Sequence, residues 1–579
     1  MSLRGYGCDV PIAIATLTAC GLLVAIFAHP TAAQQTDYSE AIAQVEEVAN
    51  REVEAGHITG VSIALVDDQR IVHSGGFGMA HKERGVTAGP ETVYRVGSIS
   101  KLFTAIGAMR LVEQRQLDLD APITDYDPAL APVKPFDAGL PITLRRLMSH
   151  RSGMFRESPV GGYFDDSEPS PEAVVRSIQP CVLTYRPGDR TKYSNIGVSL
   201  VGHITARRAD QPFVDYQQRQ VLAPLGMNRS AFLPDDTIRE HLATGYLYVA
   251  QPEGGFREIE SPRFELGTIP AGNLYSTAED LGRFVSMLFA DGRAGDTQMI
   301  RHATLQEMFT PQQADADTGF GLGFLVGTFR GHKTVQHSGA VYGFTSSLVA
   351  LPEEKLAVIV LANDDITTGP VDRISDAALG ALLQAKLDEQ PPVPPQTVEL
   401  PQQRLAAMAG QYESESYWAE LTLHNGQLSG IVSGQPLELQ ATSENTFRAS
   451  GRLWDGSELA FERDAEQPDR FRFMDQIFRR VRQDQSMNPP ERWQQYVGSY
   501  GPDFIPLIVS IRHGHLYMMT ENLYDYRLRP VNTEVFACPP GLYEGEEIVF
   551  QRNAGGEVYG VILANMPLAR RPAAERDAD

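Results

Sequence analysis

The chain has little cysteine. Its 579 residues contain four, and two of these, Cys8 and Cys20, lie within the first 33 positions. Cys181 and Cys538 remain, and they are too far apart in sequence to indicate a disulfide framework or the paired thiolates of a zinc site. We therefore expect two buried thiols. Because no cluster of His, Cys, Asp and Glu has ligand spacing, the sequence implies no metal and no organic cofactor.

Positive charge is also scarce. The chain has 50 Lys and Arg against 73 Asp and Glu, which gives a net charge of −23. A protein with this balance repels polyanions, so nucleic acid and anionic membrane surfaces are not expected as partners. The apolar share of 42% is that of an ordinary globular protein.

Long apolar runs are absent except near the N-terminus. Pro11–Ala28 is such a run, and it lies between Arg4 and the small residues Thr31-Ala32-Ala33. This pattern predicts a secretory signal at residues 1–33. Because Asp9 offsets the single Arg, an uncleaved membrane anchor is the alternative. We expect an exported protein, periplasmic or secreted, that contacts a membrane only if this segment is retained.

The length predicts several domains. Residues 34–388 are expected to form the first, because apolar residues recur there at helical spacing between strand-like runs. This order predicts an α/β (α+β) domain in which helices back an antiparallel sheet. The predicted helices are 39–53, 98–116, 144–148, 198–208, 278–289 and 374–387, and the predicted strands are 61–66, 70–74, 323–329, 334–337, 346–351 and 356–361.

The C-terminal part has a different sequence pattern. Residues 389–401 are rich in proline and predict a stiff linker. Beyond them the pattern is all-β, with Asn425-Gly426 as a strong signal for a tight hairpin turn. We divide this part into two repeats, residues 402–484 and 490–574.

Short sequence segments that recur in the same order in both halves support the division into two repeats. Gly410-Gln411-Tyr412 recurs as Gly498-Ser499-Tyr500 at an offset of 88, and Arg479-Arg480 recurs as Arg570-Arg571 at an offset of 91. Three further matches lie between these two. A unit of roughly 85 residues is too long for a solenoid repeat and suits a small antiparallel β-barrel or sandwich.

Ser98 begins one of the predicted helices, and Lys101 lies one turn later. Both side chains can therefore meet on one helix face. A serine hydroxyl needs a base to become a nucleophile, and an amine at this spacing can serve. The N–H groups at the start of the helix also favour developing negative charge. By itself Ser-x-x-Lys is a weak signal, because a Ser cap followed by a solvated Lys has the same pattern.

Two further motifs could complete such a site. Tyr193 and Asn195 are two residues apart, so in extended backbone they point the same way. The anion of Tyr193 would be favoured beside a lysine ammonium and could accept the serine proton, while Asn195 could bond the lysine and a substrate amide. In His337-Ser338-Gly339-Ala340, Gly339 would let a substrate approach a strand edge, and the Ala340 N–H could form an oxyanion hole with the Ser98 N–H. His-x-Gly also occurs at His73 and His424, so His337 is preferred on order and context.

In this order and spacing, the three motifs resemble those of the serine β-lactamase and penicillin-binding protein superfamily. The resemblance is greatest to its class C-like branch of β-lactamase-related hydrolases, D-aminopeptidases, DD-carboxypeptidases and esterases, and it covers about residues 40–387. It implies that Ser98 is the acylated nucleophile, that Lys101 and Tyr193 share the general-base role, and that Asn195, His337 and Gly339 bind substrate. D-aminopeptidase-like members of this superfamily also carry two β-barrels after the catalytic domain.

The chain departs from the family pattern at His337. β-Lactamases and many DD-peptidases have a lysine there, and a neutral or half-charged imidazole would hold a substrate carboxylate weakly. We therefore expect an exported serine hydrolase that forms an acyl-enzyme on Ser98 with D-amino-acid peptides, amides or esters. The alternatives are a class C-like β-lactamase, a carboxylesterase, or an inactive member that binds peptidoglycan or a protein. The expected partners are a small-molecule, peptide or ester substrate, with peptidoglycan as a further candidate.

Overall fold

The structure is a computed structural model that describes residues 36–136, 139–251, 255–393, 396–462, 469–482 and 488–572. The predicted secretory signal at residues 1–33 lies outside these ranges. Within them, no helix combines the length and apolar character needed to cross a membrane. The described part of the predicted linker, 389–393 and 396–401, has no regular secondary structure.

The first domain is built on one antiparallel sheet of eight strands. Along β1 the side chains alternate, so that Ile63 and Leu65 pack with one buried cluster while Ala64 and Val66 pack with another. Such alternation places a hydrophobic layer on each face of the sheet. The strands lie in the order β10 (Gly319–Phe320), β11 (Leu325–Phe329), β12 (His332–Val341), β13 (Phe344–Leu351), β14 (Leu356–Ala362), β1 (Gly60–Asp67), β2 (Arg70–His81) and β3 (Val86–Thr87).

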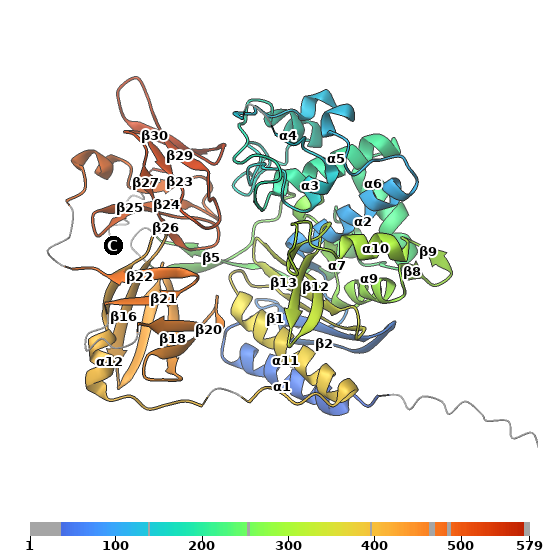
Figure 1. The fold of residues 1–579 in the computed structure, drawn as a ribbon, viewed down its shortest axis with the longest axis horizontal. Helices are drawn as coiled ribbons and strands as arrows, with labels where there is room; N and C mark the ends of the chain where they lie inside the picture. The colour runs from blue at the N-terminus through green and yellow to red at the C-terminus, as the bar shows by residue number, and fades with distance from the viewer. Residues whose placement is uncertain are drawn as a thin grey trace, which may run out of the picture. The chain divides into compact units, whose positions relative to one another are not determined.

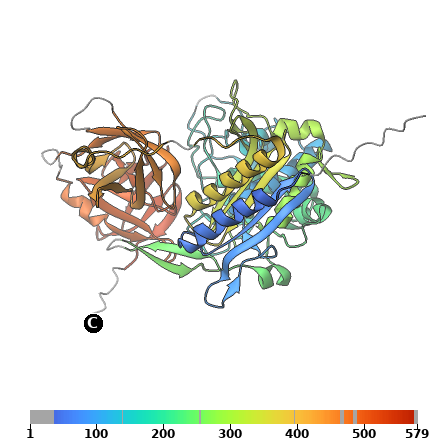
Figure 2. The same ribbon diagram turned by 90° about the horizontal axis from the view of Figure 1, so that it is seen from below.

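Helices cover both faces of this sheet. The helices α1 (Ser39–Glu54) and α11 (Thr368–Leu387) lie side by side on one face (Figures 1 and 2). On the other face α9 (Ala278–Phe289) packs against β1 and β14, and α2 (Ser100–Glu113) packs against α5 (Asn195–Ala209) and α8 (Ile269–Gly272). This arrangement is the predicted antiparallel sheet backed by helices, and it places the start of α2 beside β12 and β13.

Smaller elements fill the region between the helices. The strands β5 (Tyr246–Ala250) and β6 (Phe256–Glu260) form a hairpin that periodicity did not predict. The remaining helices are α3 (Leu144–Met148), α4 (Pro171–Ser177), α6 (Phe213–Gln217), α7 (Asp236–His241) and α10 (His302–Met308), and the remaining strand pairs are β4 (Tyr94–Arg95) with β7 (Tyr275–Ser276) and β8 (Arg293–Ala294) with β9 (Thr297–Gln298).

The first repeat is a closed eight-stranded barrel, preceded by α12 (Gln402–Met408). Asn425 and Gly426 have φ values of 51° and 79°, the left-handed pair that a type I′ hairpin requires. The strands are β15 (Gly410–Glu413), β16 (Trp418–His424), β17 (Gln427–Val432), β18 (Gln435–Ala441), β19 (Thr446–Ser450), β20 (Asp455–Phe461), β21 (Arg470–Phe473) and β22 (Gln476–Arg480).

The second repeat has the same strand succession in two separate sheets. The strand that corresponds to β18 is divided at Leu528 into two short strands. In place of the pairing between β15 and β22, the second repeat has only an isolated bridge between Tyr500 and Arg570 among the described residues. One sheet contains β23 (Gly498–Tyr500), β24 (Leu507–Arg512), β25 (His515–Met519) and β26 (Asp525–Arg527), and the other contains β27 (Arg529–Pro530), β28 (Val535–Ala537), β29 (Glu547–Arg552), β30 (Val558–Leu563) and β31 (Met566–Ala569).

The structure corrects one of the matches between the repeats. Arg480 lies over the Tyr412 ring and donates to the carbonyl groups of Ala407 and Ala409. Arg570 does the same with the Tyr500 ring and the carbonyl groups of Gln495 and Val497. Arg480 therefore corresponds to Arg570 at an offset of 90, and the sequence match at 91 is wrong by one residue.

Corresponding loops of the two repeats contact the first domain. In the first repeat, the backbone of residues 451–454 accepts hydrogen bonds from Gly369 N and the Arg373 guanidinium. In the second repeat, residues 541–546 accept hydrogen bonds from Lys192 Nζ and Arg156 N. The loop of the first repeat binds at the start of α11, whereas that of the second binds next to Ser98.

Candidate active site

Ser98 stands where the chain turns into α2. The turn is a single 3-10 turn, Gly97–Ile99, and Gly97 has a φ of 51° that favours glycine. A Cβ at Gly97 would also lie only 2.9 Å from Ala340 N, so this position has no room for a side chain. Ser98 is partly exposed at the bottom of a cavity of about 490 Å³.

Lys101 and Tyr193 meet at the Ser98 hydroxyl, as the motifs predicted. Lys101 Nζ lies 2.9 Å from Ser98 Oγ and donates to the Ala271 carbonyl at 2.7 Å. The Tyr193 hydroxyl donates to the same Ser98 Oγ at 2.8 Å. Lys101 is 1% exposed, and the Tyr193 ring stacks on His150 at 4.3 Å. Ser98 Oγ is thus held between one amine and one phenol.

The charge states differ from those expected from the sequence. Burial holds the pKa of Lys101 well below its ordinary value, and burial also raises the pKa of Tyr193 to about 12. Both shifts disfavour the charged forms. Burial therefore favours a neutral lysine beside a neutral phenol over the expected tyrosine anion beside a lysine ammonium, because the site excludes the water that would stabilise either charge. A neutral lysine can accept the Ser98 proton, while neutral Tyr193 donates to Ser98 Oγ.

Asn195 does not hold the lysine. Ser194 caps α5 with a hydrogen bond from Gly197 N to its side chain, so Asn195 lies in the first helical turn and not in extended backbone. Its amide donates to Glu157 Oε1. The contact expected from Asn195 is made by the Ala271 carbonyl, and Asn195 is not among the residues that line the cavity.

The wall opposite Tyr193 is the edge of β12. β11 pairs with β12 only as far as Gln336, so none of the described strands pairs with residues 337–341 on that side. The cavity is lined there by His337, Ser338, Gly339 and Ala340. A Cβ at Gly339 would lie 2.1 Å from the Val96 carbonyl oxygen and 3.0 Å from Ser98 N, which shows how closely this strand approaches the serine.

His337 is a buried, neutral side chain that lines the cavity. It is 6% exposed, and burial together with the nearby Lys101 lowers its pKa to about 3. Nδ1 lies 2.6 Å from the Ser338 carbonyl oxygen, so this nitrogen carries the proton. Nε2 accepts no hydrogen bond from the described residues. The other two His-x-Gly sequences lie elsewhere, in β2 and at the end of β16.

Several residues of the site carried no signal in the sequence. Arg156 and Glu157 lie in the mostly irregular stretch 153–190, and no sequence motif singles them out. Gly541, Leu542 and Glu544 come from the second repeat and line the same cavity as Ser98. In the described ranges, no group of three or more His, Cys, Asp and Glu side chains is arranged to hold a metal ion.

Comparisons with known proteins agree with this geometry. The family model described as "Beta-lactamase" matches residues 45–383, more than half of the chain. Penicillin-binding protein 4 of Amycolatopsis lactamdurans is 26% identical over 374 residues, which cover 62% of this chain and 94% of that protein.

Two solved structures are similar as well. The octameric penicillin-binding protein homologue from Pyrococcus abyssi is 25% identical, with a TM-score of 0.53 over 76% of this chain and 99% of that one. The D-amino acid amidase from Ochrobactrum anthropi SV3, complexed with D-phenylalanine, is 25% identical, with a TM-score of 0.50 over 60% of this chain and 100% of that one. The chain therefore belongs to the Beta-lactamase family and is a hydrolase of the serine β-lactamase and penicillin-binding protein superfamily.

Proposed function

We propose that this protein is an exported serine hydrolase that forms an acyl-enzyme on Ser98 with D-amino-acid amides, peptides or esters. The observation that carries the proposal is the Ser98 hydroxyl between Lys101 and Tyr193, beside a strand edge where His337 lines the cavity. Export rests on the pattern of residues 1–33.

The three side chains support a complete acylation step. The Ser98 proton passes to the neutral Lys101 amine while Oγ bonds to the acyl carbon. In this step the backbone N–H groups of Ser98 and Ala340 bind the oxyanion that forms, and the close approach of β12 to Ser98 N supports this role. The leaving group then departs with a proton that the Lys101 ammonium returns through the Tyr193 hydroxyl. Water hydrolyses the resulting ester with the same groups in reverse roles.

The polarity of the cavity supports a substrate that donates hydrogen bonds. Because Nδ1 of His337 is committed to the Ser338 carbonyl, Nε2 can only accept while the ring is neutral. A buried acceptor without a partner is costly, and a substrate N–H or ammonium would relieve that cost. The D configuration is proposed on the likeness to the D-amino acid amidase.

The chemistry can be tested without knowing the substrate. Mass spectrometry after exposure to a fluorophosphonate should find an adduct on Ser98 that is absent from the Ser98→Ala variant. The absence of any adduct on Ser98 would overturn the proposed function.

The substrate class requires a panel. D-Ala p-nitroanilide should be hydrolysed faster than L-Ala p-nitroanilide, a D-Ala-D-Ala peptide or nitrocefin, with short p-nitrophenyl esters as a general acyl substrate. Faster turnover of nitrocefin would identify a β-lactamase, and turnover of esters alone would identify a carboxylesterase. Either result would contradict the amide assignment while leaving the acyl-enzyme intact.

A further inference from the structure

A buried group of charged side chains lies directly behind Tyr193. The Arg156 guanidinium lies over the Tyr193 ring, with its carbon 5.4 Å from the ring centroid. Its side chain is 13% exposed, and Nε lies 3.4 Å from Glu157 Oε1 and 3.8 Å from Glu521 Oε1. The Glu157 and Glu521 side chains are 1% and 5% exposed. Such charges are stable in a protein interior only as a mutually compensating set.

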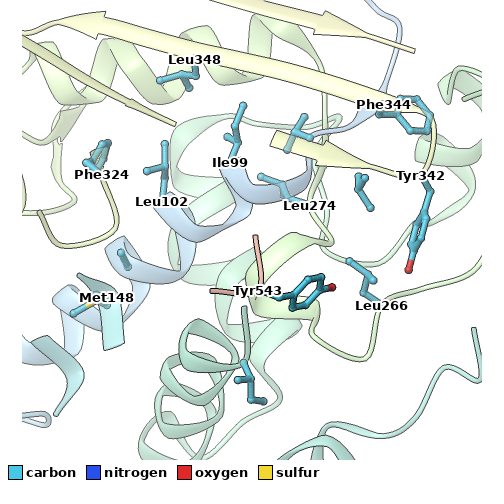
Figure 3. Packing of buried hydrophobic residues seen from close by; sticks show 14 of the residues in the cluster. Ile99, Leu102, Met148, Leu266, Leu274, Phe324, Tyr342, Phe344, Leu348 and Tyr543 are labelled. Carbon is cyan, nitrogen blue, oxygen red and sulfur yellow. The ribbon is translucent and has the colours of Figure 1, made fainter. Parts of the chain in front are cut away.

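The second repeat supplies much of this set. Glu521 follows β25, and its Oε1 accepts a hydrogen bond from the Tyr543 hydroxyl at 2.8 Å. The Tyr543 ring also faces Arg156, with the guanidinium carbon 5.9 Å from its centroid. Figure 3 shows Tyr543 within the same buried cluster as Ile99 and Leu274 of the first domain. The second repeat therefore contributes a side chain to the buried cluster that contains Ile99, the residue after Ser98.

A second buried pair fixes the backbone at Arg156. Lys192 Nζ lies 2.8 Å from Glu546 Oε1, with the two side chains 6% and 3% exposed. The same Glu546 oxygen accepts a hydrogen bond from Arg156 N at 3.2 Å. Lys192 precedes Tyr193 in the chain, so one carboxylate of the second repeat ties together both segments that carry the Arg156–Tyr193 contact.

We propose that Arg156 is a positioning residue for the Ser98 reaction, and that the second repeat controls it through Glu521. The inference rests on the proposed function, because it assigns a role in the protonation of Lys101 and Tyr193. The Arg156 guanidinium and the Lys101 amine, which must be neutral to take the Ser98 proton, both lie against the Tyr193 ring, at 5.4 Å and 4.8 Å from its centroid. The field of the guanidinium therefore disfavours a second positive charge at Lys101.

The electrostatic surroundings agree with this role. The positive charge of Arg156 lowers the pKa of both Lys101 and Tyr193, whereas the negative charge of Glu157 raises both. Burial raises the pKa of the Glu157 carboxyl to about 7 and raises that of Glu521. The titratable groups that face Lys101 and Tyr193 are His150, His337, Arg156 and Glu157, and those that face Arg156 from the second repeat are Glu521, Tyr543 and Glu546.

The test is the rate of Ser98 labelling by a fluorophosphonate as a function of pH, measured on the full chain. Arg156→Gln should move the acidic limb of the profile to higher pH by about one unit and so slow labelling about tenfold on that limb. Arg156→Lys keeps the charge and should restore most of the rate. An unchanged profile in Arg156→Gln would refute the positioning role.

A double-mutant cycle tests the control by the second repeat. Glu521→Gln leaves the Arg156 charge less compensated, so it should move the acidic limb of the profile to lower pH in the wild-type background. It should have no further effect in the Arg156→Gln background, because residues that act through one another are not additive. If the fold-changes of the two single substitutions multiply in the double variant, this part of the proposal is overturned. Glu534→Gln is the matched control, since Glu534 pairs with Arg552 within the second repeat, and it should leave the profile unchanged.

The two proposals fail in different ways. If wild-type Ser98 is not labelled at any pH, the proposed function fails and the role of Arg156 fails with it. If Ser98 is labelled but Arg156→Gln leaves the profile unchanged, only the role of Arg156 fails. Melting temperatures of all variants identify any variant that does not fold, and Glu521→Gln, which keeps the size and polarity of its side chain, then carries the test.

Discussion

Gly339→Ala should nearly abolish turnover by moving the edge of β12 away from Ser98. The added Cβ would stand 2.1 Å from the Val96 carbonyl oxygen and 2.5 Å from Ser346 Oγ, and ordinary contact begins near 3.4 Å, so the strand must shift by 1.3 Å. A displacement of about 1 Å at a reaction centre lowers rates about 100-fold. Loss of one oxyanion donor lowers kcat by about 100- to 1000-fold. We therefore expect kcat to fall by about 100- to 1000-fold.

The assay is steady-state hydrolysis of p-nitrophenyl acetate together with fluorophosphonate labelling of Ser98, and the melting temperature is measured in parallel. Gly89→Ala is the matched control, because a Cβ there meets no atom within 4 Å, and it should retain wild-type kcat. A folded Gly339→Ala protein with a kcat within about threefold of the wild type would refute the inference that this strand edge forms the oxyanion site.

Three further predictions follow from the same site. His337→Lys should weaken hydrolysis of D-Ala p-nitroanilide and strengthen that of carboxylated substrates, because a cation replaces a neutral imidazole at this edge; kcat/KM for both substrates measures the change, and equal loss for both would contradict it. Lys192→Met should lower stability by about 3–5 kcal/mol, since Glu546 remains buried without its cation; thermal unfolding measures it, and Lys192→Met with Glu546→Gln should recover part of the loss. The rate of Ser98 labelling should rise with pH as Lys101 loses its proton, over the range set by its lowered pKa. Glu157→Gln should move this acidic limb of the pH profile to lower pH, because the Glu157 carboxylate raises the Lys101 pKa. A shift of the limb to higher pH would refute this role of Glu157.

The sequence predicted the parts of the fold that local pattern controls. The helix at Ala278–Phe289 begins and ends where its periodicity and its Thr277 cap place it, and the strands before and after the helices form one antiparallel sheet. The meeting of Ser98, Lys101 and Tyr193 could also be expected, because each motif occurs once and in a known order. These features depend on short-range signals or on a resemblance of the whole motif set.

Charge and long-range contact could not be predicted in the same way. The spacing of Tyr193 and Asn195 gives no sign that Ser194 caps a helix that begins at Asn195. The extended backbone expected at Asn195 is therefore wrong. The direction of the Lys101 and Tyr193 pKa shifts depends on how completely other segments exclude water. Arg156 and Glu521 have no motif, since their importance comes from being buried against each other across two domains.

The place of the second repeat in the cavity has a consequence for the order in which the molecule matures. Domains fold largely in chain order during synthesis, so the sheet and helices that hold Ser98 can assemble before the last repeat exists. The wall made by residues 541–546 and the counterion from Glu521 come only when that repeat has folded and docked. A nascent or truncated chain without this repeat would have Ser98 in place but would lack part of the cavity wall. The site would become complete only at the last step of folding.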